Sequence, residues 1–486
     1  MDHLPILQVV IPLVLAPLCL LLARQAWLIA LVGSVSSLVC ATFLLAGVLE
    51  NGPSNYYVGG WEPPWGIALS VDLLGGFIVL LVSLIATLVV AWAHHSVKDE
   101  IRDDQVNLFW CMFMLCLTGS FGIVVTGDAF NVFVFLEVSS LSTYTMIALG
   151  KDRRALTASF QYLVMGTVGA TFILIAVGLL YMMTGTLNMA DLAERLPALR
   201  DTSTVRAAFA FLTVGVSLKI ALFPLHQWLP NAYTYAPSAV TAFLAATATK
   251  VSLYVLLRFF FTVFGADFVF DELHVDYLLL PLSLLAIFIA STVAVYQEDL
   301  KRILAYSSVA QIGYMTLGIA LANTKGLTAT IVHMFNHGLI KGGLFLAVGG
   351  ICLRLGSTRL SDLKGAGRAM PWTMGAIVIG GCSLIGIPLT VGFISKWYLI
   401  IAALEAQMWY IAAAIVVASM IAVAYVWRII ETLYFQEGET TLREVPLYML
   451  LPTWILIVLL VWLGVDTDLT VGIAERAAQS LMGLQP

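Results

Sequence analysis

The sequence predicts an all-α polytopic membrane protein with about fourteen transmembrane helices. Of its 486 residues, 60% are hydrophobic and only 11% are charged, and the mean hydropathy is +0.96. A soluble domain carries about 25% charged residues, so this composition indicates a chain that lies within a lipid bilayer. The charged residues stand between apolar segments and form no long basic run, so the net charge of −5 indicates no nucleic-acid partner.

Fourteen apolar segments are long enough to cross a bilayer, which takes about 20 residues each. They lie near residues 5–23, 26–49, 68–93, 107–126, 129–148, 158–184, 205–223, 237–262, 276–296, 302–322, 326–351, 371–403, 408–433 and 447–466. Because they use almost the whole chain, residues 1–486 are expected to form a single membrane domain. The first run lacks a basic start and a small-residue cleavage site, so we expect a helix there and not a removed signal peptide.

The basic residues between these segments predict the orientation, because lysine and arginine accumulate in cytoplasmic loops. One side of the fourteen-helix arrangement has Arg24, Lys98, Arg102, Lys151, Arg153, Arg154, Lys301, Arg302, Arg354, Arg359, Lys364, Arg368, Arg428 and Arg443. The other side has only Arg195, Arg200, Arg206, Arg258, Lys325 and Arg476. We therefore expect the first side to be cytoplasmic and both termini to face outward.

Four lysines lie inside predicted helices: Lys219, Lys250, Lys341 and Lys396. A lysine at the centre of a membrane helix costs about 2.5–3.5 kcal/mol, so such residues indicate function. Glu137, about nine residues into its own helix, is the candidate partner of Lys219. The alternative for each lysine is snorkelling toward the membrane surface or a purely structural ion pair.

Two of these lysines stand beside predicted helix breaks. Pro224 follows Lys219 by five residues, and Pro388 interrupts a glycine-containing run shortly before Lys396. Irregular backbone at membrane depth occurs only where it is buried in protein or lines a wet cavity. Two interrupted helices of this kind are typical of a transporter built from two repeats, although glycine and proline are also common in membrane helices generally.

The segment IVHMFNHGLIKGGLF, residues 331–345, has a ladder of ionisable groups: His333, His337 and Lys341. Their spacing of four places them near one face of a helix, with a rise of about 6 Å between neighbours. Histidine titrates near neutrality, so the ladder is suited to proton exchange. The alternatives are a helical metal pair, for which no third ligand stands nearby in the sequence, and core histidines with no role in transport.

Together with Glu137, Lys219, Lys250 and Lys396, this ladder predicts a row of proton-exchanging sites along the membrane plane. Residues 245–252 and 306–315 add hydroxyls and an amide that can hold bridging waters. Asp72 and Asp128, near the outer ends of their helices, are candidate cation contacts, with ordinary interfacial aspartates as the alternative.

No motif predicts a cofactor or a metal site in this chain. The six cysteines fall in apolar runs without a C-x-x-C pair, and the sequence has no G-x-G-x-x-G dinucleotide loop and no P-loop. We therefore expect no redox or nucleotide chemistry, and any such chemistry would belong to another subunit.

Several long motifs resemble the proton-translocating antiporter family. SLKIALFPLHQWLPNAYTYAPSAVTAFLAATATK, YSSVAQIGYM, HMFNHGLIKGGLF and LIGIPLTVGFISKW are similar to core motifs shared by Mrp-type cation/proton antiporters, complex I membrane subunits and membrane-bound hydrogenases. The resemblance spans roughly residues 65–430. The chain length and YVGGWEPPWGIALSVDLL, residues 57–74, most resemble the D subunits of Mrp-type Na⁺/H⁺ antiporters.

This resemblance implies two inverted five-helix repeats. We expect helices 1–3 in residues 1–106, the first repeat in 107–262, the second repeat in 276–433, and the last helix with a tail in 447–486. It also implies a glutamate–lysine pair at Glu137 and Lys219, a central lysine at Lys250, histidine sites at His333 and His337, and a terminal lysine at Lys396.

The implied function is a proton-translocating subunit of a multisubunit cation/proton antiporter in a bacterial or archaeal cell membrane. Other membrane subunits, protons and monovalent cations, with Na⁺ first, are the expected partners. One alternative is a proton-pumping subunit of a complex I-type dehydrogenase or hydrogenase. Another, from a different class, is a non-conducting scaffold whose buried charges only hold helices together.

Overall fold

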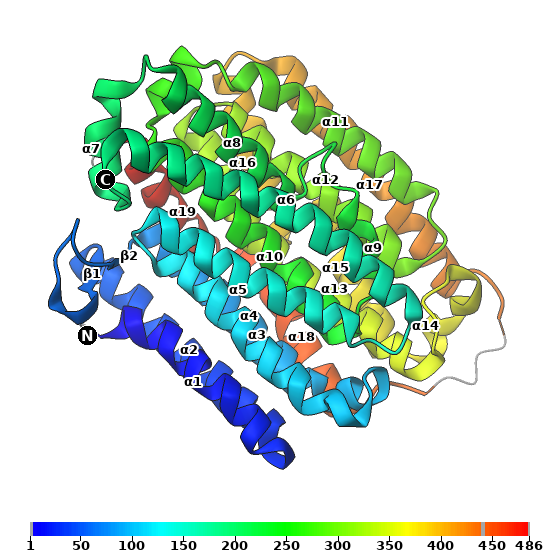
Figure 1. The fold of residues 1–486 in the computed structure, drawn as a ribbon. Helices are drawn as coiled ribbons and strands as arrows, with labels where there is room; N and C mark the ends of the chain where they lie inside the picture. Colours follow the sequence, from blue (N-terminus) through cyan, green and yellow to red (C-terminus); the bar gives the residue numbers. More distant parts are fainter. Residues whose placement is uncertain (1–2, 439–442, 485–486) are drawn as a thin grey trace.

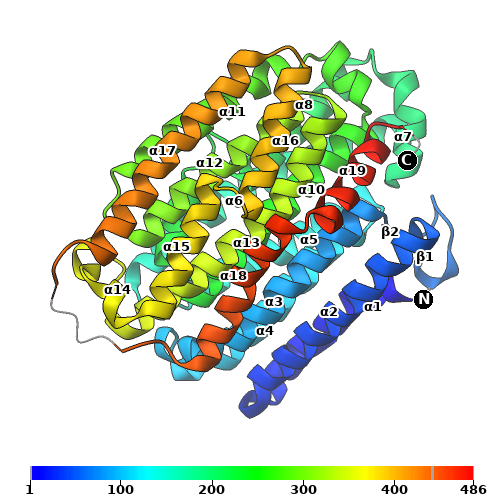
Figure 2. The same cartoon turned by 180° about the vertical axis from the view of Figure 1, so that it is seen from behind.

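Long apolar helices make up the fold, because lipid leaves backbone groups without partners unless each segment satisfies its own. The structure is a computed structural model that describes residues 3–438 and 443–484. Its helices run side by side as one bundle, with α1 (Leu4–Leu21) and α2 (Ala26–Asn51) as a pair along one edge (Figure 1). The described ends of the chain lie at the same end of the bundle, which Figure 2 shows from behind.

The remaining helices divide into a long middle part and a short C-terminal part. The middle part contains α3 (Leu73–Glu100), α4 (Val106–Val125), α5 (Ala129–Ala148), α6 (Arg153–Thr184), α7 (Met189–Arg195), α8 (Ser203–Ile220), α9 (Trp228–Tyr235), α10 (Ser238–Leu257), α11 (Asp276–Val295), α12 (Leu300–Ala320), α13 (Thr324–Leu355), α14 (Ala366–Ala369), α15 (Pro371–Ile385), α16 (Val391–Glu405) and α17 (Trp409–Tyr434). The C-terminal part contains α18 (Leu447–Val465) and α19 (Asp468–Leu481).

The prediction of about fourteen membrane helices is confirmed. Thirteen helices of the described chain are long and apolar enough to cross a membrane. The predicted span 371–403 is present as two shorter helices, α15 and α16, which are separated by a break at residues 386–390. The other predicted break, at Pro224, lies between α8 and α9.

Three segments differ from the sequence-based expectation. The third helix begins at Leu73 and not near residue 68, because residues Ala68–Val71 form strand β2. This strand pairs antiparallel with β1 (Ser54–Tyr57), and Asp72 caps the helix that follows. The connection at 185–204 contains the short helix α7. The expected C-terminal tail contains the amphipathic helix α19, whose apolar face packs on α13, so hydropathy alone did not reveal it.

The centre of the bundle is formed by helices that are buried on nearly all sides. Almost every residue of α10 and α12 is buried, and so are most residues of α3, α4 and α13. The outer helices α1, α2 and α17 instead leave much of their apolar surface exposed, as expected for helices that face lipid or other subunits. Each expected five-helix repeat, 107–262 and 276–433, contains a broken helix as its fourth member: α8 with α9, and α15 with α16. The inverted orientation of the two repeats stays a prediction.

Candidate functional site

The predicted partners Glu137 and Lys219 meet between α5 and α8. The Lys219 Nζ lies 3.4 Å from Glu137 Oε1 and donates a 2.8 Å hydrogen bond to Ser140 Oγ. The Lys219 side chain is only 3% exposed and the Glu137 side chain 23%, so the lysine charge is buried beside a carboxylate that reaches a more open environment. A carboxylate partner and hydrogen bonds together offset the cost of burying the ammonium.

The break beside Lys219 is local and well satisfied. Helix α8 ends at Ile220 because Ala221 adopts a left-handed conformation with a φ of 63°, and α9 begins seven residues later at Trp228. The Trp228 indole donates a 3.0 Å hydrogen bond to the Leu218 carbonyl in the last turn of α8, and this carbonyl also accepts from Ala221 N at 3.2 Å. The prediction of a broken helix next to Lys219 is therefore confirmed.

Lys250 lies at the centre of the bundle on α10 and is fully buried. Its Nζ donates a 2.5 Å hydrogen bond to the Ala245 carbonyl on the same helix. Within residues 3–438 and 443–484, no carboxylate forms an ion pair with it. Such a lysine is suited to a role in which it gains and loses a proton, since a permanent charge there would lack compensation.

The ladder on α13 is buried throughout. The ring centroids of His333 and His337 lie 5.8 Å apart, close to the expected rise of about 6 Å, with the rings nearly parallel at 4°. His333 Nδ1 lies 2.6 Å from Ser395 Oγ on α16. Lys341 Nζ donates to Ser307 Oγ at 2.5 Å and to the Leu304 carbonyl at 2.7 Å, both on α12.

Three ring nitrogens of the ladder have no partner among the described protein groups: His333 Nε2, His337 Nδ1 and His337 Nε2. Buried polar atoms in folded proteins bind protein groups or ordered water, so these nitrogens are suited to hold water between the steps of the ladder. Within the described chain, no group of three or more His, Cys, Asp or Glu side chains is placed to hold a metal ion.

Lys396 binds backbone carbonyls that the second helix break exposes. Its Nζ donates to the carbonyls of Leu384 at 3.0 Å and Ile385 at 2.8 Å, which are free because α15 ends there. A third contact, of 3.2 Å, reaches Ser419 Oγ on α17, and the ammonium lies 4.8 Å from the ring centroid of Tyr314. The negative end of the half-helix and the aromatic face both stabilise the lysine charge.

These side chains stand on neighbouring helices in a regular order. Helix α8 packs on α10, α10 packs on α13, and α13 packs on α16. The order therefore runs from Lys219 through Lys250 and the ladder to Lys396, and the His333–Ser395 contact joins the ladder to the helix that holds Lys396. We call this set, with Glu137 at its first end, the buried row.

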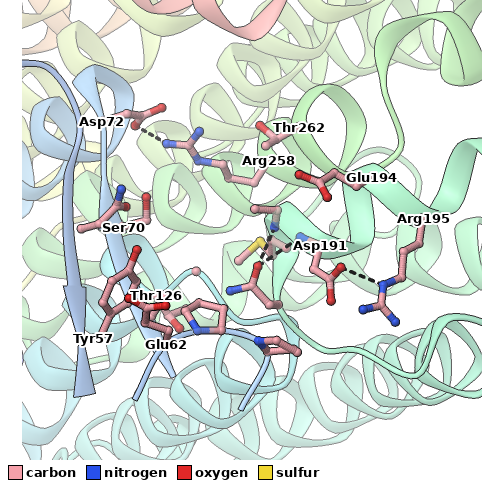
Figure 3. Close-up of a pocket in the computed structure, with 18 of the residues that line it drawn as sticks. Tyr57, Glu62, Ser70, Asp72, Thr126, Asp191, Glu194, Arg195, Arg258 and Thr262 are labelled. Atoms are coloured by element: carbon pink, nitrogen blue, oxygen red, sulfur yellow. Dashed lines mark hydrogen bonds and ion pairs between the residues drawn. The ribbon is translucent and has the colours of Figure 1, made fainter. Parts of the chain in front are cut away.

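The two candidate cation contacts lie outside the buried row. Asp72 caps α3 by accepting a hydrogen bond from Gly75 N at 2.9 Å, and it forms an ion pair with Arg258. Asp128 caps α5 by accepting from Asn131 N at 2.8 Å. Figure 3 shows that Asp72 and Arg258 belong to a separate polar cavity.

The sequence placed Lys301 in a cytoplasmic loop, whereas the structure buries it in the first turn of α12, where it is only 4% exposed. Its Nζ lies 3.2 Å from Ser238 Oγ, and Glu100 accepts hydrogen bonds from Ser238 N at 2.7 Å and Ser238 Oγ at 3.1 Å. No sequence signal separates this lysine from the neighbouring Arg302, because the contact depends on the packing of α3, α10 and α12 against one another.

A bundle with two broken helices and a row of buried lysines and histidines on adjacent helices fits the class of antiporter-like membrane subunits. The family described as "NADH:quinone oxidoreductase/Mrp antiporter, TM" matches residues 126–422, which include every member of the buried row. The chain belongs to this family.

Its relatives come from more than one kind of complex. The chain is 43% identical to the N subunit of the NADH-quinone oxidoreductase of Desulforudis audaxviator, over 91% of this chain and 90% of the relative. It is 31% identical to the D subunit of the Na(+)/H(+) antiporter of Alkalihalophilus pseudofirmus, over 96% of this chain and 94% of the relative. Both relatives are named as subunits of larger assemblies.

Two solved complexes contain chains of similar structure. One is an archaeal membrane-bound sulfane sulfur reductase, with a TM-score of 0.92, 29% identity and coverage of 99% of this chain and 98% of that chain. The other is the Mrp complex from Dietzia sp. DQ12-45-1b, with a TM-score of 0.91, 26% identity and the same coverage. The fold is thus shared between antiporter and respiratory complexes.

Proposed function

We propose that the chain is the proton-translocating subunit of a multisubunit cation/proton antiporter, in which protons move along the buried row and Na⁺ is the exchanged cation. The observation that carries the proposal is the placement of four lysines and two histidines on adjacent central helices. Each lysine except Lys250 contacts a hydroxyl side chain, which can accept or pass a proton.

Glu137 controls the first step. While it is ionised, it compensates the Lys219 ammonium; once it is neutralised or turned away, Lys219 becomes an uncompensated buried charge and releases its proton toward Lys250. The spacing within the ladder exceeds a hydrogen bond, so water bridges its steps. Lys396, held by free carbonyls at a helix break, is the proton uptake or release group at the far end.

The proposed setting is a bacterial or archaeal cell membrane, with the chain inserted so that both termini face outward and other membrane subunits surround it. The relatives, which are named as D and N subunits, support a multisubunit assembly. The extensive exposed apolar surface of the outer helices supports contact with lipid and such subunits.

A second candidate function is proton pumping within a redox-driven complex of the complex I type. The 43% identity to a relative named as the N subunit of an NADH-quinone oxidoreductase favours it. The buried row would act in the same way, with the driving force supplied by another subunit. Neighbouring genes for small antiporter subunits support the first candidate, and genes for quinone-reducing or hydrogenase subunits support the second.

The experiment measures Na⁺-driven pH change in vesicles that contain the complex and no other antiporter, normalised to the amount of assembled complex. Lys250→Met should lower the rate about tenfold or more, because a positioned proton-transfer group contributes 10²–10⁴-fold. The matched control Lys364→Met changes an exposed loop lysine and should keep the native rate. Equal rates in both variants would instead support the scaffold alternative.

A further inference from the structure

A polar cavity of about 540 Å³ opens at the end of the bundle that contains the β1–β2 hairpin and α7. We call it the hairpin-end cavity. Backbone hydrogen bonds fix its rim: Gly127 N donates to the Ala68 carbonyl, and Met189 N donates to the Gly127 carbonyl, each at 2.9 Å. The cavity is thus preformed by four separate parts of the chain: the hairpin, the α4–α5 turn, α7 and the end of α10.

Acidic side chains outnumber basic ones in the lining of the cavity. Four carboxylates line it, and two of them are paired, Asp72 with Arg258 and Asp191 with Arg195. Figure 3 shows Asp72 and Arg258 extending toward one another, and Glu62 and Glu194 at other points of the lining. Glu62 and Glu194 are exposed and form no ion pair with the described residues. This arrangement gives a negative rim, which concentrates cations, including protons, from the adjoining water.

Tyr254 and Arg258, near the end of α10, form the floor of the cavity. The Arg258 side chain is 13% exposed, and its Nε donates a 2.9 Å hydrogen bond to the Tyr254 hydroxyl. Tyr254 also lines the cavity but is otherwise buried, and its hydroxyl donates to the Val124 carbonyl at 2.7 Å. Lys250 precedes Tyr254 by one helical turn on α10. Lys250, Tyr254 and Arg258 are therefore spaced by four residues and lie on one face of that helix.

We propose that the hairpin-end cavity is an aqueous port through which Lys250 exchanges protons with the water on that side of the membrane, by way of the Tyr254 hydroxyl. The proposal rests on the proposed proton-transfer role of Lys250. The port is separate from Lys396, which stands on α16.

The first test asks whether the port is open to water and negative. Ser70→Cys places a thiol on the cavity wall, and impermeant cationic and anionic thiol reagents of equal size are applied to the intact complex from the hairpin side. We expect labelling above the wild-type background, with the cationic reagent at least about threefold faster. Combining Ser70→Cys with Glu62→Gln and Glu194→Gln should abolish that preference.

A control thiol separates the cavity from the surface in general. Asp201→Cys lies at an exposed site on the connection between α7 and α8 and does not line the cavity, so it should react without the cationic preference. No labelling of Ser70→Cys from the hairpin side, or equal rates for both reagents, would overturn the port.

The second test addresses the relay. Tyr254→Phe removes only the hydroxyl, and we expect proton transport per assembled complex to fall about fivefold or more. Tyr57→Phe is the matched control, because this substitution also removes one tyrosine hydroxyl, and Tyr57 lines the outer, exposed part of the same cavity. It should keep the native rate. Equal rates in the two phenylalanine variants would refute the relay through Tyr254.

Lys250→Met distinguishes failure of this port from failure of the proposed function. If Lys250→Met stops transport while Tyr254→Phe behaves like Tyr57→Phe, the port is wrong and the buried row stands. If Lys250→Met is itself fully active, Lys250 transfers no protons, and both the proposed function and the port fail.

Discussion

The imidazoles of His333 and His337 lie on consecutive turns of α13 with their centroids 5.8 Å apart, and His337 has no protein partner at either ring nitrogen among the described residues. His333 instead contacts Ser395 at 2.6 Å. The two histidines therefore differ in environment although their spacing in sequence makes them look equivalent.

The first prediction follows from that difference. His337→Ala removes the middle step of the ladder and leaves a gap of about 12 Å between the outer steps, so it should impair proton transfer more than His333→Ala. His337→Lys restores a titratable group and should retain more activity than His337→Ala. Transport in vesicles, normalised to intact complex, checks this; equal normalised rates in wild type and His337→Ala would rule out a proton path through this helix.

The second prediction concerns the ion pair at the start of the row. Glu137→Ala leaves the Lys219 charge without compensation and should reduce cation-dependent proton flux about tenfold or more, with the complex still assembled. Ser140→Ala removes one hydrogen bond between Lys219 and an uncharged acceptor but keeps the carboxylate, so a reduction of only about two- to fivefold is expected. Near-native flux in Glu137→Ala would contradict the pairing as a functional device.

The third prediction separates titration from fixed charge at Lys250 and Lys396. Arginine keeps the positive charge but does not release its proton, so Lys250→Arg and Lys396→Arg should be about as inactive as the alanine variants. Lys151→Arg, at an exposed loop position, is the control and should behave as wild type. An active arginine variant would indicate an electrostatic or structural role for that lysine.

The fourth prediction concerns stability. Glu100, at the end of α3, accepts the backbone hydrogen bond of Ser238 at the start of α10 and so acts as a helix cap supplied by another helix. Glu100→Ala should destabilise the complex by about 1–2 kcal/mol in thermal unfolding, because the cap is lost and the nearby buried Lys301 loses a neighbouring carboxylate. Asp104→Ala breaks only the exposed pair with Arg102 and should change stability by less than about 0.5 kcal/mol. Similar melting of the two variants would disprove the capping role.

Local features of the sequence were sufficient to predict the long apolar helices, the two breaks and the residues that lie in the buried row, but not the short helices α7 and α19. Apolar length determines which segments cross a bilayer, and proline with glycine determines where such a segment is interrupted, so Lys219 and Lys396 were correctly placed beside breaks. The spacing of four within residues 331–345 likewise predicted the separation of the two histidine rings.

Only the tertiary structure decided which side chains meet across helices. Asp72 and Arg258 are 186 residues apart in the chain, and His333 and Ser395 are 62 apart. The burial of Lys301 and the docking of α19 on α13 depend in the same way on how distant helices pack. Hydropathy and helical period describe one segment at a time, whereas these contacts arise from the shape complementarity of several segments, which no single stretch of sequence contains.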